Sequence, residues 1–468
     1  MNERTPSSSG GIYDGFRRIA TASPGRTAVV DGHTGEVTTA GTLLERADAF
    51  AGHLEARGLR RGDPIAVQLP NSADLIALFL ASLRIGCTFV PIDRDATESE
   101  VARILDDFSI RALLDRESFW SPDSLPLFEL RSDSRARRFD VALLKLTSGS
   151  TGHPRGILTS EENLISDCRN ICSSMEIHPQ DVNLGAIPLS HSYGFSNLVT
   201  PLLLQGTAVV ISNDYVPLSI VELCNRFGCT VVPGIPMMFD FLSQLPAGDG
   251  GFETVRTFIS AGAPLLPSVS RRFRERFGKP IHTFYGCSEC GGITYDRVGA
   301  AVERGSCGKP LDGVQVAIGA EGRIGISSRS VARGYVGATE AESVTFGERT
   351  FVSDDLASIR PDGEIELTGR IGDLINIAGK KVNPREVERV IRRIEGVREV
   401  KVYGEPAGAR GDVVAAAIVA DGAVTRDAVR AFCREHLSQH KVPRVIKLID
   451  SMPLDARGKI RKSALAEL

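Results

Sequence analysis

Apolar and polar positions along the chain predict strands and helices in turn. Short apolar runs at residues 64–68 and 141–146 are typical of buried strands, whereas residues 72–85 and 217–227 have the apolar spacing of amphipathic helices. Regular alternation of this kind favours parallel sheets that are covered by helices. We therefore expect an α/β fold for most of the chain.

The pattern changes twice toward the C-terminus. Residues 305–369 contain short apolar segments separated by turns such as Asp362-Gly363, which indicates an antiparallel barrel or meander. Beyond them, Asn383 precedes an amphipathic helix and two apolar strands, which is typical of a separate α+β unit. We expect a disordered tip (residues 1–10), a large N-terminal domain (11–370) and a small C-terminal domain (371–468).

Length and charge narrow the class of protein. The chain has 468 residues and a formal net charge of −3, so we expect more than one domain and no nucleic-acid partner. No run approaches the roughly 20 apolar residues that cross a bilayer, so we expect no membrane span. The nine cysteines follow no disulfide framework, which suits a reducing compartment. We expect a cytoplasmic protein that is a monomer or homodimer.

The segment 145–156, KLTSGSTGHPRG, has the composition of an anion-binding loop after a buried strand. Its glycines let backbone N–H groups approach a phosphate, and its hydroxyls and cation add to the attraction. It is not a Walker loop, because Thr151-Gly152-His153 stands where Gly-Lys-Ser/Thr is required. A flexible linker is the alternative. The phosphate-binding candidates are Thr147, Ser148, Gly149, Ser150, Thr151, Gly152 and Arg155.

Polar side chains also follow two later predicted strands. His191 lies where a strand gives way to a helix, a position at which open α/β sheets bind ligands. A strand at 281–284 runs into YGCSECGG, which offers the ring of Tyr285, the hydroxyl of Ser288 and the carboxylate of Glu289. Such a set suits a nucleotide with Mg²⁺. The alternatives are a structural histidine and a solvated loop acid.

Cys287 and Cys290 of the same segment form a CxxC pair. A zinc site would need a second pair of similar spacing or nearby histidines, and the other cysteine pairs of the chain do not supply it. Coincidence and a redox switch are the interpretations that remain.

Taken together, these segments resemble the adenylate-forming superfamily, which includes acyl-CoA and aryl-CoA synthetases, luciferases and peptide-synthetase adenylation domains. The motifs that carry the resemblance are TSGSTGHPRG, PLSHSYGF, AGAPL, YGCSECGG, FVSDDLASI and PLDARGKIRK, in the family's order. The resemblance implies a large N-terminal domain of two doubly wound sheets plus a small β-barrel, and a smaller mobile C-terminal α+β domain with a hinge near residue 372. It also implies ATP, Mg²⁺ and coenzyme A as cofactors.

The resemblance further implies roles for individual residues. Lys459 takes the place of the catalytic lysine, and His191 lies beside the reacting carboxylate. Glu289, with Thr151, would hold Mg²⁺. Besides the phosphate loop, ATP would contact Gly262, Ala263, Pro264, Tyr285, Gly286, Ser288, Asp355 and Arg370. The acid would contact His191, Ser192, Tyr193, Gly286 and Gly291. For residues 261–265 a tight turn between strand and helix is an equal alternative.

The residues after His191 narrow the acid. Adenylation domains for α-amino acids place an Asp near this point to hold the substrate ammonium, but this chain has Ser192 and Tyr193. A buried ammonium facing only hydroxyls would be poorly compensated, at a cost of several kcal/mol. We therefore expect activation of a non-amino carboxylic acid, with an aryl acid preferred and CoA as the acceptor.

Four positions depart from the family pattern. Arg155 replaces the usual lysine and Ser288 the usual threonine. Asp354 replaces a glycine beside the ribose-binding Asp355, and Gly372 replaces the Asp or Lys of the hinge. Two rival functions stay open. The adenylate could pass to a carrier-protein thiol or an amine, or the chain could be a catalytically silent protein that binds ATP or an acyl group.

Overall fold

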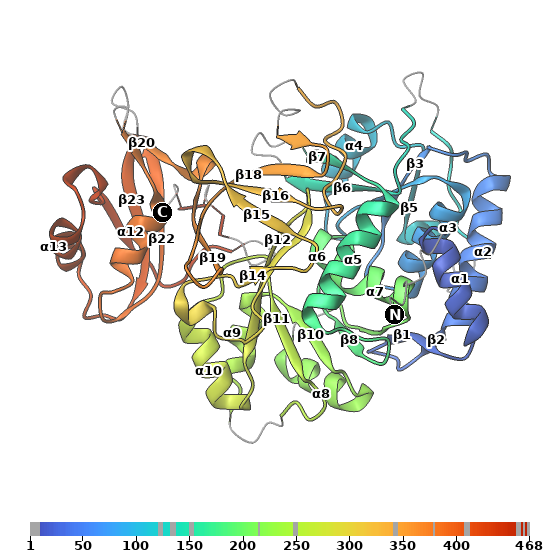
Figure 1. The fold of residues 1–468 in the computed structure, drawn as a ribbon, viewed down its shortest axis with the longest axis horizontal. Helices are drawn as coiled ribbons and strands as arrows, with labels where there is room; N and C mark the ends of the chain where they lie inside the picture. The colour runs from blue at the N-terminus through green and yellow to red at the C-terminus, as the bar shows by residue number, and fades with distance from the viewer. Residues whose placement is uncertain are drawn as a thin grey trace, which may run out of the picture. The chain divides into compact units, whose positions relative to one another are not determined.

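The computed structural model describes most of the chain, in two compact units. The described residues are 10–119, 125–131, 137–148, 154–213, 216–246, 251–339, 345–377, 380–406, 412–454, 460–461 and 464–465. The first unit comprises Met1–Val316 and Ile326–Phe351, and the second comprises Ala317–Gly325 and Val352–Leu468. The expected α/β fold is confirmed, and Figure 1 traces it from blue to red.

The smaller sheet of the first unit has five strands in the order β5-β3-β4-β6-β7. Its strands are β3 (Pro64–Gln68), β4 (Thr88–Pro91), β5 (Ala112–Asp115), β6 (Leu143–Ser148) and β7 (Pro154–Thr159). The pairings among β3, β4, β5 and β6 are parallel, whereas β7 pairs antiparallel with β6. The sequence does not predict β7, so the phosphate-loop segment connects two strands of a hairpin rather than a strand and a helix.

Three helices alternate along the chain with strands β3, β4 and β5 of this sheet. They are α2 (Ala40–Ala56), α3 (Ala73–Ile85) and α4 (Glu98–Asp107). The ends of α3 follow from local chemistry. The Ser72 side chain accepts a hydrogen bond from the Leu75 amide, and Gly86 ends the helix with a φ of 73°.

The larger sheet of the first unit has nine strands in the order β14-β13-β12-β11-β10-β8-β9-β1-β2. Its strands are β1 (Thr27–Asp31), β2 (Val37–Thr39), β8 (Val182–Gly185), β9 (Ala208–Ile211), β10 (Val231–Gly234), β11 (Thr257–Ser260), β12 (Ile281–Cys287), β13 (Gly291–Tyr295) and β14 (Lys309–Pro310). The six central strands, β12, β11, β10, β8, β9 and β1, pair in parallel. At the edges, β2 pairs antiparallel with β1, and β13 and β14 continue the sheet beyond β12 with antiparallel pairings.

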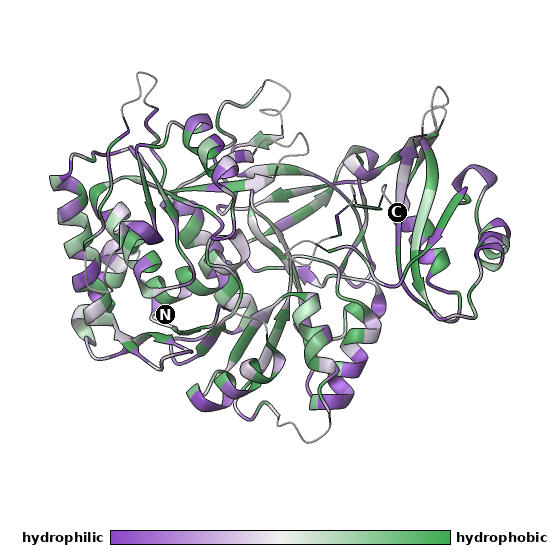
Figure 2. Cartoon of the chain, turned by 180° about the vertical axis from the view of Figure 1, so that it is seen from behind, coloured by the Kyte–Doolittle hydropathy of each residue, from purple (hydrophilic) through white to green (hydrophobic). Residues whose placement is uncertain are grey.

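Helices cover both faces of this larger sheet. They are α1 (Ile12–Ala22), α5 (Glu161–Met175), α7 (Thr200–Gln205), α8 (Pro217–Phe227), α9 (Pro236–Ser243) and α10 (Pro267–Phe277). Adjacent side chains of β9 point to opposite faces of the sheet. Val209 packs in the core cluster that contains residues of α5 and α7, whereas Val210 packs in the cluster that contains residues of α8 to α10. Figure 2 shows hydrophobic residues concentrated in the strands and hydrophilic ones on the outer turns of helices.

Phenylalanines fill the two cores. Phe79 of α3 lies edge-on to Phe89 of β4 and to Phe195, with ring centroids 5.4 and 4.8 Å apart. In the other core, Phe258 and Phe273 have centroids 4.9 Å apart. These contacts fix the positions of the sheets whose edges carry the candidate site.

After β14, the region expected to form a barrel or meander contains, among its described residues, the strands β15 (Gln315–Ile318), β16 (Arg323–Ser327), β17 (Phe346–Gly347), β18 (Thr350–Ile359) and β19 (Ile365–Arg370). They form a sheet of order β15-β16-β18-β17, with β19 paired to β18. Strand β18 pairs antiparallel with both β17 and β19. The boundary between the two units falls within this region.

The second unit ends in an α+β fold. Its further elements are β20 (Ile375–Ile377), β21 (Lys380–Val382), α12 (Pro384–Ile391), β22 (Val397–Pro406), β23 (Asp412–Ala420), α13 (Arg426–His436) and β24 (Val445–Leu448). Asn383 caps α12, as the sequence predicts, by accepting from the Arg385 amide. No helix among the described residues of the chain is long and apolar enough to cross a membrane.

Candidate functional site

The turn between β12 and β13 presents Ser288 and Glu289. Strand β12 extends to Cys287, three residues beyond the expected end at residue 284, because it continues as a hairpin with β13. In this hairpin Gly286 lies opposite Gly292, and a Cβ on Gly286 would come within 2.5 Å of the Gly291 carbonyl oxygen. The close approach explains why glycine occupies position 286.

A buried carboxylate, that of Asp167, contacts the backbone at Gly291 and Gly292. Asp167 of α5 accepts hydrogen bonds from the Gly292 amide (2.9 Å) and the Ser196 hydroxyl (2.7 Å). Gly291 has a φ of 74°, and a Cβ at this position would overlap the Asp167 carboxylate. Burial raises the pKa of Asp167, and the charge of Lys145 with the two hydrogen bonds partly offsets that rise. Residues 291 and 292 thus have no room for side chains.

Glu289 is oriented by residues of a distant segment. The Tyr335 hydroxyl donates to Oε1 of Glu289 at 2.9 Å, and the Ala332 amide donates to the Glu289 carbonyl at 2.8 Å. The guanidinium of Arg155 lies over the Tyr335 ring, 5.3 Å from its centroid. Burial, and then the charge of Glu289, raise the pKa of Tyr335, so its phenol remains a donor at neutral pH.

The β6–β7 hairpin fixes the ends of the phosphate-loop segment. Thr147 lies opposite Arg155 in the antiparallel register, and Ser148 lies opposite Pro154. Tyr335 forms a bridge to Ile157 of β7, which explains why Arg155 and Tyr335 meet. Four predicted loop residues, Gly149, Ser150, Thr151 and Gly152, lie outside the described residues. Their roles therefore stay predictions.

Lys145 connects β6 with the β12–β13 turn. It is a charged residue on a buried strand, only 6% exposed, and its Nζ donates to the carbonyl of Ser288 at 3.5 Å. It lies two residues before Thr147, so both side chains project from the same face of β6. A buried ammonium at this place puts positive charge beside the residues that the sequence assigns to phosphate and metal.

The segment around His191 meets the same turn. The Ser192 hydroxyl donates to the Ser288 hydroxyl at 2.8 Å. Nε2 of His191 is 3.1 Å from Oδ2 of Asp93, although the two groups are not aligned as a hydrogen bond. The Tyr193 hydroxyl donates to the Ile259 carbonyl, and burial raises its pKa well above the usual value. The structure thus brings together the predicted acid segment and the predicted metal segment.

A π-helix follows this segment directly. Residues Ser192–Gly194 form a short helical turn, α6, and Phe195–Val199 continue it as a π-helix before α7 begins. Such widened turns are frequent at functional sites. At Gly194 a Cβ would overlap the Pro188 carbonyl, so the turn packs backbone against backbone. The geometry presents Ser192 toward Ser288.

The predicted adenine-contact turn lies after β11. Gly262 has a φ of 86°, which a residue with a side chain rarely adopts, and Ala263 and Pro264 continue the turn toward α10. Tyr285 lies on β12, opposite Thr294 of β13. Gly262 thus has the backbone conformation of a tight turn. Contact of Gly262, Ala263, Pro264 and Tyr285 with a nucleotide stays a prediction.

Two predicted nucleotide residues lie in the second unit. Asp355 of β18 and Arg370 of β19 face each other in register, with Oδ1 and Nε 3.8 Å apart. Asp354, the unexpected second acid, instead pairs with Arg323 at 3.1 Å. Neighbouring side chains of a strand point to opposite faces, which separates Asp354 from Asp355. Lys459, the predicted catalytic lysine, lies outside the described residues.

Four side chains at the site are missed by the sequence interpretation: Asp93, Lys145, Asp167 and Tyr335. Only Lys145 leaves a signal in the sequence, because it interrupts an otherwise apolar run, VALLKL. The partners of the others are distant along the chain, so no local pattern marks them.

The donor set at the turn bears on Mg²⁺. The described residues contain no group of three or more His, Cys, Asp or Glu side chains that could hold a metal ion. Glu289 therefore offers a single carboxylate, which fits an Mg²⁺ that takes its remaining ligands from substrate phosphates and water. The same finding gives no support to a metal site at Cys287 and Cys290.

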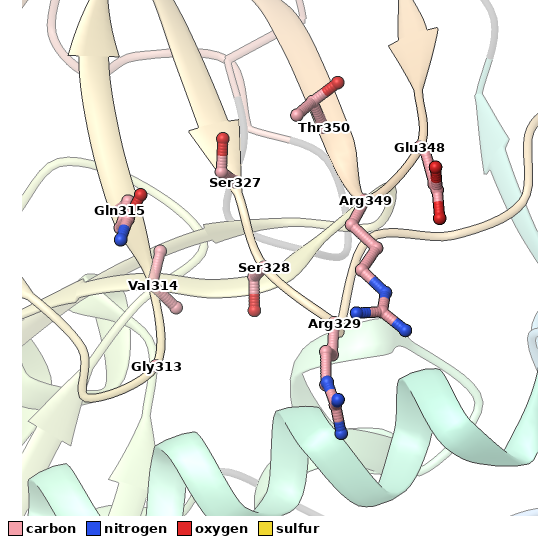
Figure 3. A pocket seen from close by; sticks show the side chains of 9 residues that line it. All are labelled: Gly313, Val314, Gln315, Ser327, Ser328, Arg329, Glu348, Arg349 and Thr350. Atoms are coloured by element: carbon pink, nitrogen blue, oxygen red, sulfur yellow. The ribbon is translucent and has the colours of Figure 1, made fainter.

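A pocket of about 400 Å³ lies elsewhere in the first unit (Figure 3). It is lined by residues 313–315, 327–329 and 348–350, none of which the sequence predicts for the site. In Figure 3, Arg329 and Arg349 extend toward the same side of the pocket. Arg349 has its guanidinium 3.6 Å from Glu162 of α5. This pocket is separate from the site built around Ser288.

Comparison with known proteins matches the chain along most of its length. A family model described as AMP-binding enzyme matches residues 16–336, and one described as AMP-binding enzyme C-terminal domain matches residues 386–459. A feruloyl-CoA synthase from an Amycolatopsis species is 29% identical over 95% of this chain and 96% of its own.

Solved structures agree with this match. ATP-bound MatB from Rhodopseudomonas palustris has a TM-score of 0.84 and 25% identity, covering 97% of this chain and 98% of its own. The amide bond synthetase McbA from Marinactinospora thermotolerans has a TM-score of 0.83 and 26% identity, covering 98% and 99%.

Proposed function

The chain belongs to the AMP-binding enzyme family of the adenylate-forming superfamily, and from this premise we propose how its site works. It is an AMP-forming ligase of the acyl-CoA and aryl-CoA synthetase type. The reaction that we propose joins a non-amino carboxylic acid to AMP with release of pyrophosphate, and then transfers the acyl group to the thiol of coenzyme A.

One contact carries the proposal. The 2.8 Å hydrogen bond between the hydroxyls of Ser192 and Ser288 joins the acid segment to the segment that carries Glu289. An acid beside His191 and Ser192 would therefore lie next to the residues assigned to the α-phosphate and the metal. This neighbourhood supports attack of a carboxylate on the α-phosphorus.

The charges around the turn suit that step. A carboxylate and ATP repel each other, so the reaction needs cations that are already in position. Lys145 of β6 donates to the Ser288 carbonyl, and the Arg155 guanidinium of β7 lies over the Tyr335 ring that contacts Glu289. Mg²⁺, when held by Glu289 with Thr151, would neutralise phosphate oxygens. Tyr335 would keep the Glu289 carboxylate in the orientation that this requires.

The second unit would complete the site during the reaction. Asp355 and Arg370 would bind the ribose, and Lys459 would contact the reacting carboxylate and α-phosphate. Rotation near Gly372 would then withdraw Lys459 so that CoA can attack the adenylate. The ion pair of Asp354 with Arg323 supports this assignment, since it removes the extra acid from the strand face that carries Asp355.

We infer an aryl acid as the preferred substrate. Ser192 and Tyr193 provide no carboxylate for a substrate ammonium, which disfavours α-amino acids. The partly buried Tyr193 ring lies 5.8 Å from that of Phe284, and this aromatic pair supports a flat substrate. The similarity to a feruloyl-CoA synthase favours the same class.

ATP–pyrophosphate exchange over a panel of hydroxybenzoic, cinnamic and aliphatic acids tests the proposal. We expect exchange with aryl acids and, once CoA is added, formation of a thioester. Lys459→Ala should abolish exchange while the melting temperature is kept, whereas Lys309→Ala, an exposed lysine on β14, should leave exchange unchanged.

Two other outcomes would redirect the proposal. Exchange without a thioester would favour a carrier protein or an amine as acceptor, and the similarity to an amide bond synthetase makes amines the first acceptors to add. Absence of exchange with every acid, combined with ATP binding in calorimetry, would indicate a silent binder.

A further inference from the structure

The two cysteines of the CxxC pair enclose the central turn of the site. The Sγ atoms of Cys287, at the end of β12, and Cys290, just before β13, are 3.2 Å apart. Both are free thiols, Cys287 partly exposed and Cys290 fully buried. The two residues between them are Ser288 and Glu289. No other part of the proposed mechanism uses these thiols.

We propose that Cys287 and Cys290 form a reversible disulfide when the protein meets a hydroperoxide, and that this bond stops adenylation. The inference rests on the proposed function, because its consequence is read at Ser288 and Glu289. It assigns to the CxxC pair a covalent modification that is set inside the site itself.

The chemistry proceeds in two balanced steps. The partly exposed Cys287 thiol loses its proton, attacks the terminal oxygen of hydrogen peroxide and breaks the O–O bond, which gives a sulfenic acid and one water. The Cys290 sulfur then attacks the Cys287 sulfur, its thiol proton leaves with the hydroxyl as a second water, and the S–S bond forms. The two thiols lose two electrons and the peroxide gains them.

Bond formation changes the geometry of the turn. A disulfide has sulfurs about 2.05 Å apart, so the Sγ atoms would approach by about 1 Å from their present separation. The Ser192–Ser288 bond of 2.8 Å and the Tyr335–Glu289 bond of 2.9 Å depend on that same turn. Hydrogen bonds weaken steeply with displacement, so we expect both contacts to break.

Other cysteines of the described chain are placed differently. Cys168 and Cys172 have sulfurs 3.8 Å apart, but both are buried within one helix, α5. Cys307 is partly exposed and lies just before β14. It provides a matched control in the same unit.

The test uses the full-length protein, reduced and then freed of reductant. It is exposed to hydrogen peroxide and then blocked with an alkylating reagent. Peptide mass spectrometry then reads the loss of two hydrogens across residues 287–290, and pyrophosphate exchange is measured in parallel. We expect both changes together, with exchange falling at least tenfold and recovering fully with dithiothreitol.

Variants separate the pair from other oxidation. Cys287→Ser and Cys290→Ala cannot form the disulfide, so each should keep its exchange activity under the same peroxide treatment. A sulfenic acid formed on Cys287 of the Cys290→Ala variant should be reduced by dithiothreitol. Cys307→Ser should behave like the unmodified chain. The thermal melt of each reduced variant checks that it is folded.

The proposal is overturned if no disulfide forms, if it forms without loss of exchange, or if Cys287→Ser is inactivated equally. If the reduced protein shows no exchange with any acid, the proposed function fails instead. In that case the affinity for Mg·ATP, measured by calorimetry on the reduced and oxidised protein, still tests whether the disulfide closes the site. An unchanged affinity would overturn the inference as well.

Discussion

The hydroxyl of Tyr335 donates a 2.9 Å hydrogen bond to the carboxylate of Glu289, a residue that lies 46 positions earlier in the chain. This bond holds Oε1 of Glu289 in one position. It therefore turns a flexible glutamate into an oriented one, and the contact of Arg155 with the Tyr335 ring extends the arrangement to the phosphate-loop hairpin.

Tyr335→Phe removes that bond and keeps the ring. We expect the half-saturating Mg²⁺ concentration in pyrophosphate exchange to rise several-fold, because Glu289 loses its orientation, while stability falls by only about 1 kcal/mol. Tyr13→Phe is a matched control, since Tyr13 donates a 2.5 Å bond to Asp48 away from the site. An equal change of Mg²⁺ dependence in both variants would contradict the role of Tyr335.

Lys145→Met tests the buried ammonium on β6. Methionine keeps most of the length and the apolar stem but cannot donate to the Ser288 carbonyl or supply charge. We expect kcat for exchange to fall about tenfold, which corresponds to about 1.4 kcal/mol, with KM for the acid little changed. Lys145→Gln retains a hydrogen-bond donor without the charge, so its kcat should lie between that of the unmodified protein and that of Lys145→Met. A variant that melts normally and keeps full kcat would rule out the role.

Protonation of Asp181 should lower the stability of the folded protein in acid. Burial alone would raise its pKa, but the Arg256 guanidinium, with bonds of 2.6 and 3.1 Å, the His178 amide and the Thr230 hydroxyl together lower it. In the unfolded chain the carboxyl titrates near pH 4, so its contribution is present above about pH 4 and is lost as pH falls through the lower folded pKa.

Variants make this measurable. Asp181→Ala should destabilise the protein by about 1 to 3 kcal/mol at pH 7 and by less at pH 3, because it removes a buried carboxylate that accepts from the His178 amide, the Thr230 hydroxyl and the Arg256 guanidinium. Asp140→Ala breaks a pair with Arg61 in which the side chains are 80% and 81% exposed, and should cost less than about 1 kcal/mol. Denaturant unfolding at pH 7 and pH 3 measures the free energy of unfolding that each variant loses. A loss for Asp181→Ala that is equal at the two pH values would contradict this role of Asp181.

Gly372 can be changed without strain. A Cβ there would meet no atom within 4 Å, and its φ is not in the left-handed region. Gly372→Ala should therefore keep stability or raise it by up to about 1 kcal/mol, whereas Gly363→Ala, with a φ of 83°, should cost about 1 to 2 kcal/mol. If residue 372 is the hinge, thioester formation should slow while pyrophosphate exchange stays constant. Equal effects on both half-reactions would argue against a hinge at this position.

Elements with local signals are predicted well from the sequence. Helix α8 has the expected bounds, and α5 starts after Ser160, whose side chain accepts from the Asn163 amide. Caps and apolar spacing fix such elements, because each lies within a few residues. The order of the motifs along the chain likewise predicts the family.

Features that depend on distant partners are not predicted. Strand β7 begins with a proline and contains Arg155 and Gly156, and only its pairing with β6 makes it a strand. The bond between Ser192 and Ser288 joins residues 96 positions apart. Tertiary contacts of this kind override local propensity, and a single sequence carries no trace of them.

The space that a side chain at Gly291 would need is filled by the Asp167 carboxylate. Among relatives, these two positions should therefore change together: a larger residue at 291 requires a shorter one at 167. A new acid specificity that depends on position 291 would then be reached only through a prior substitution in helix α5. The buried Asp167 thus constrains the order in which substitutions at position 291 can arise.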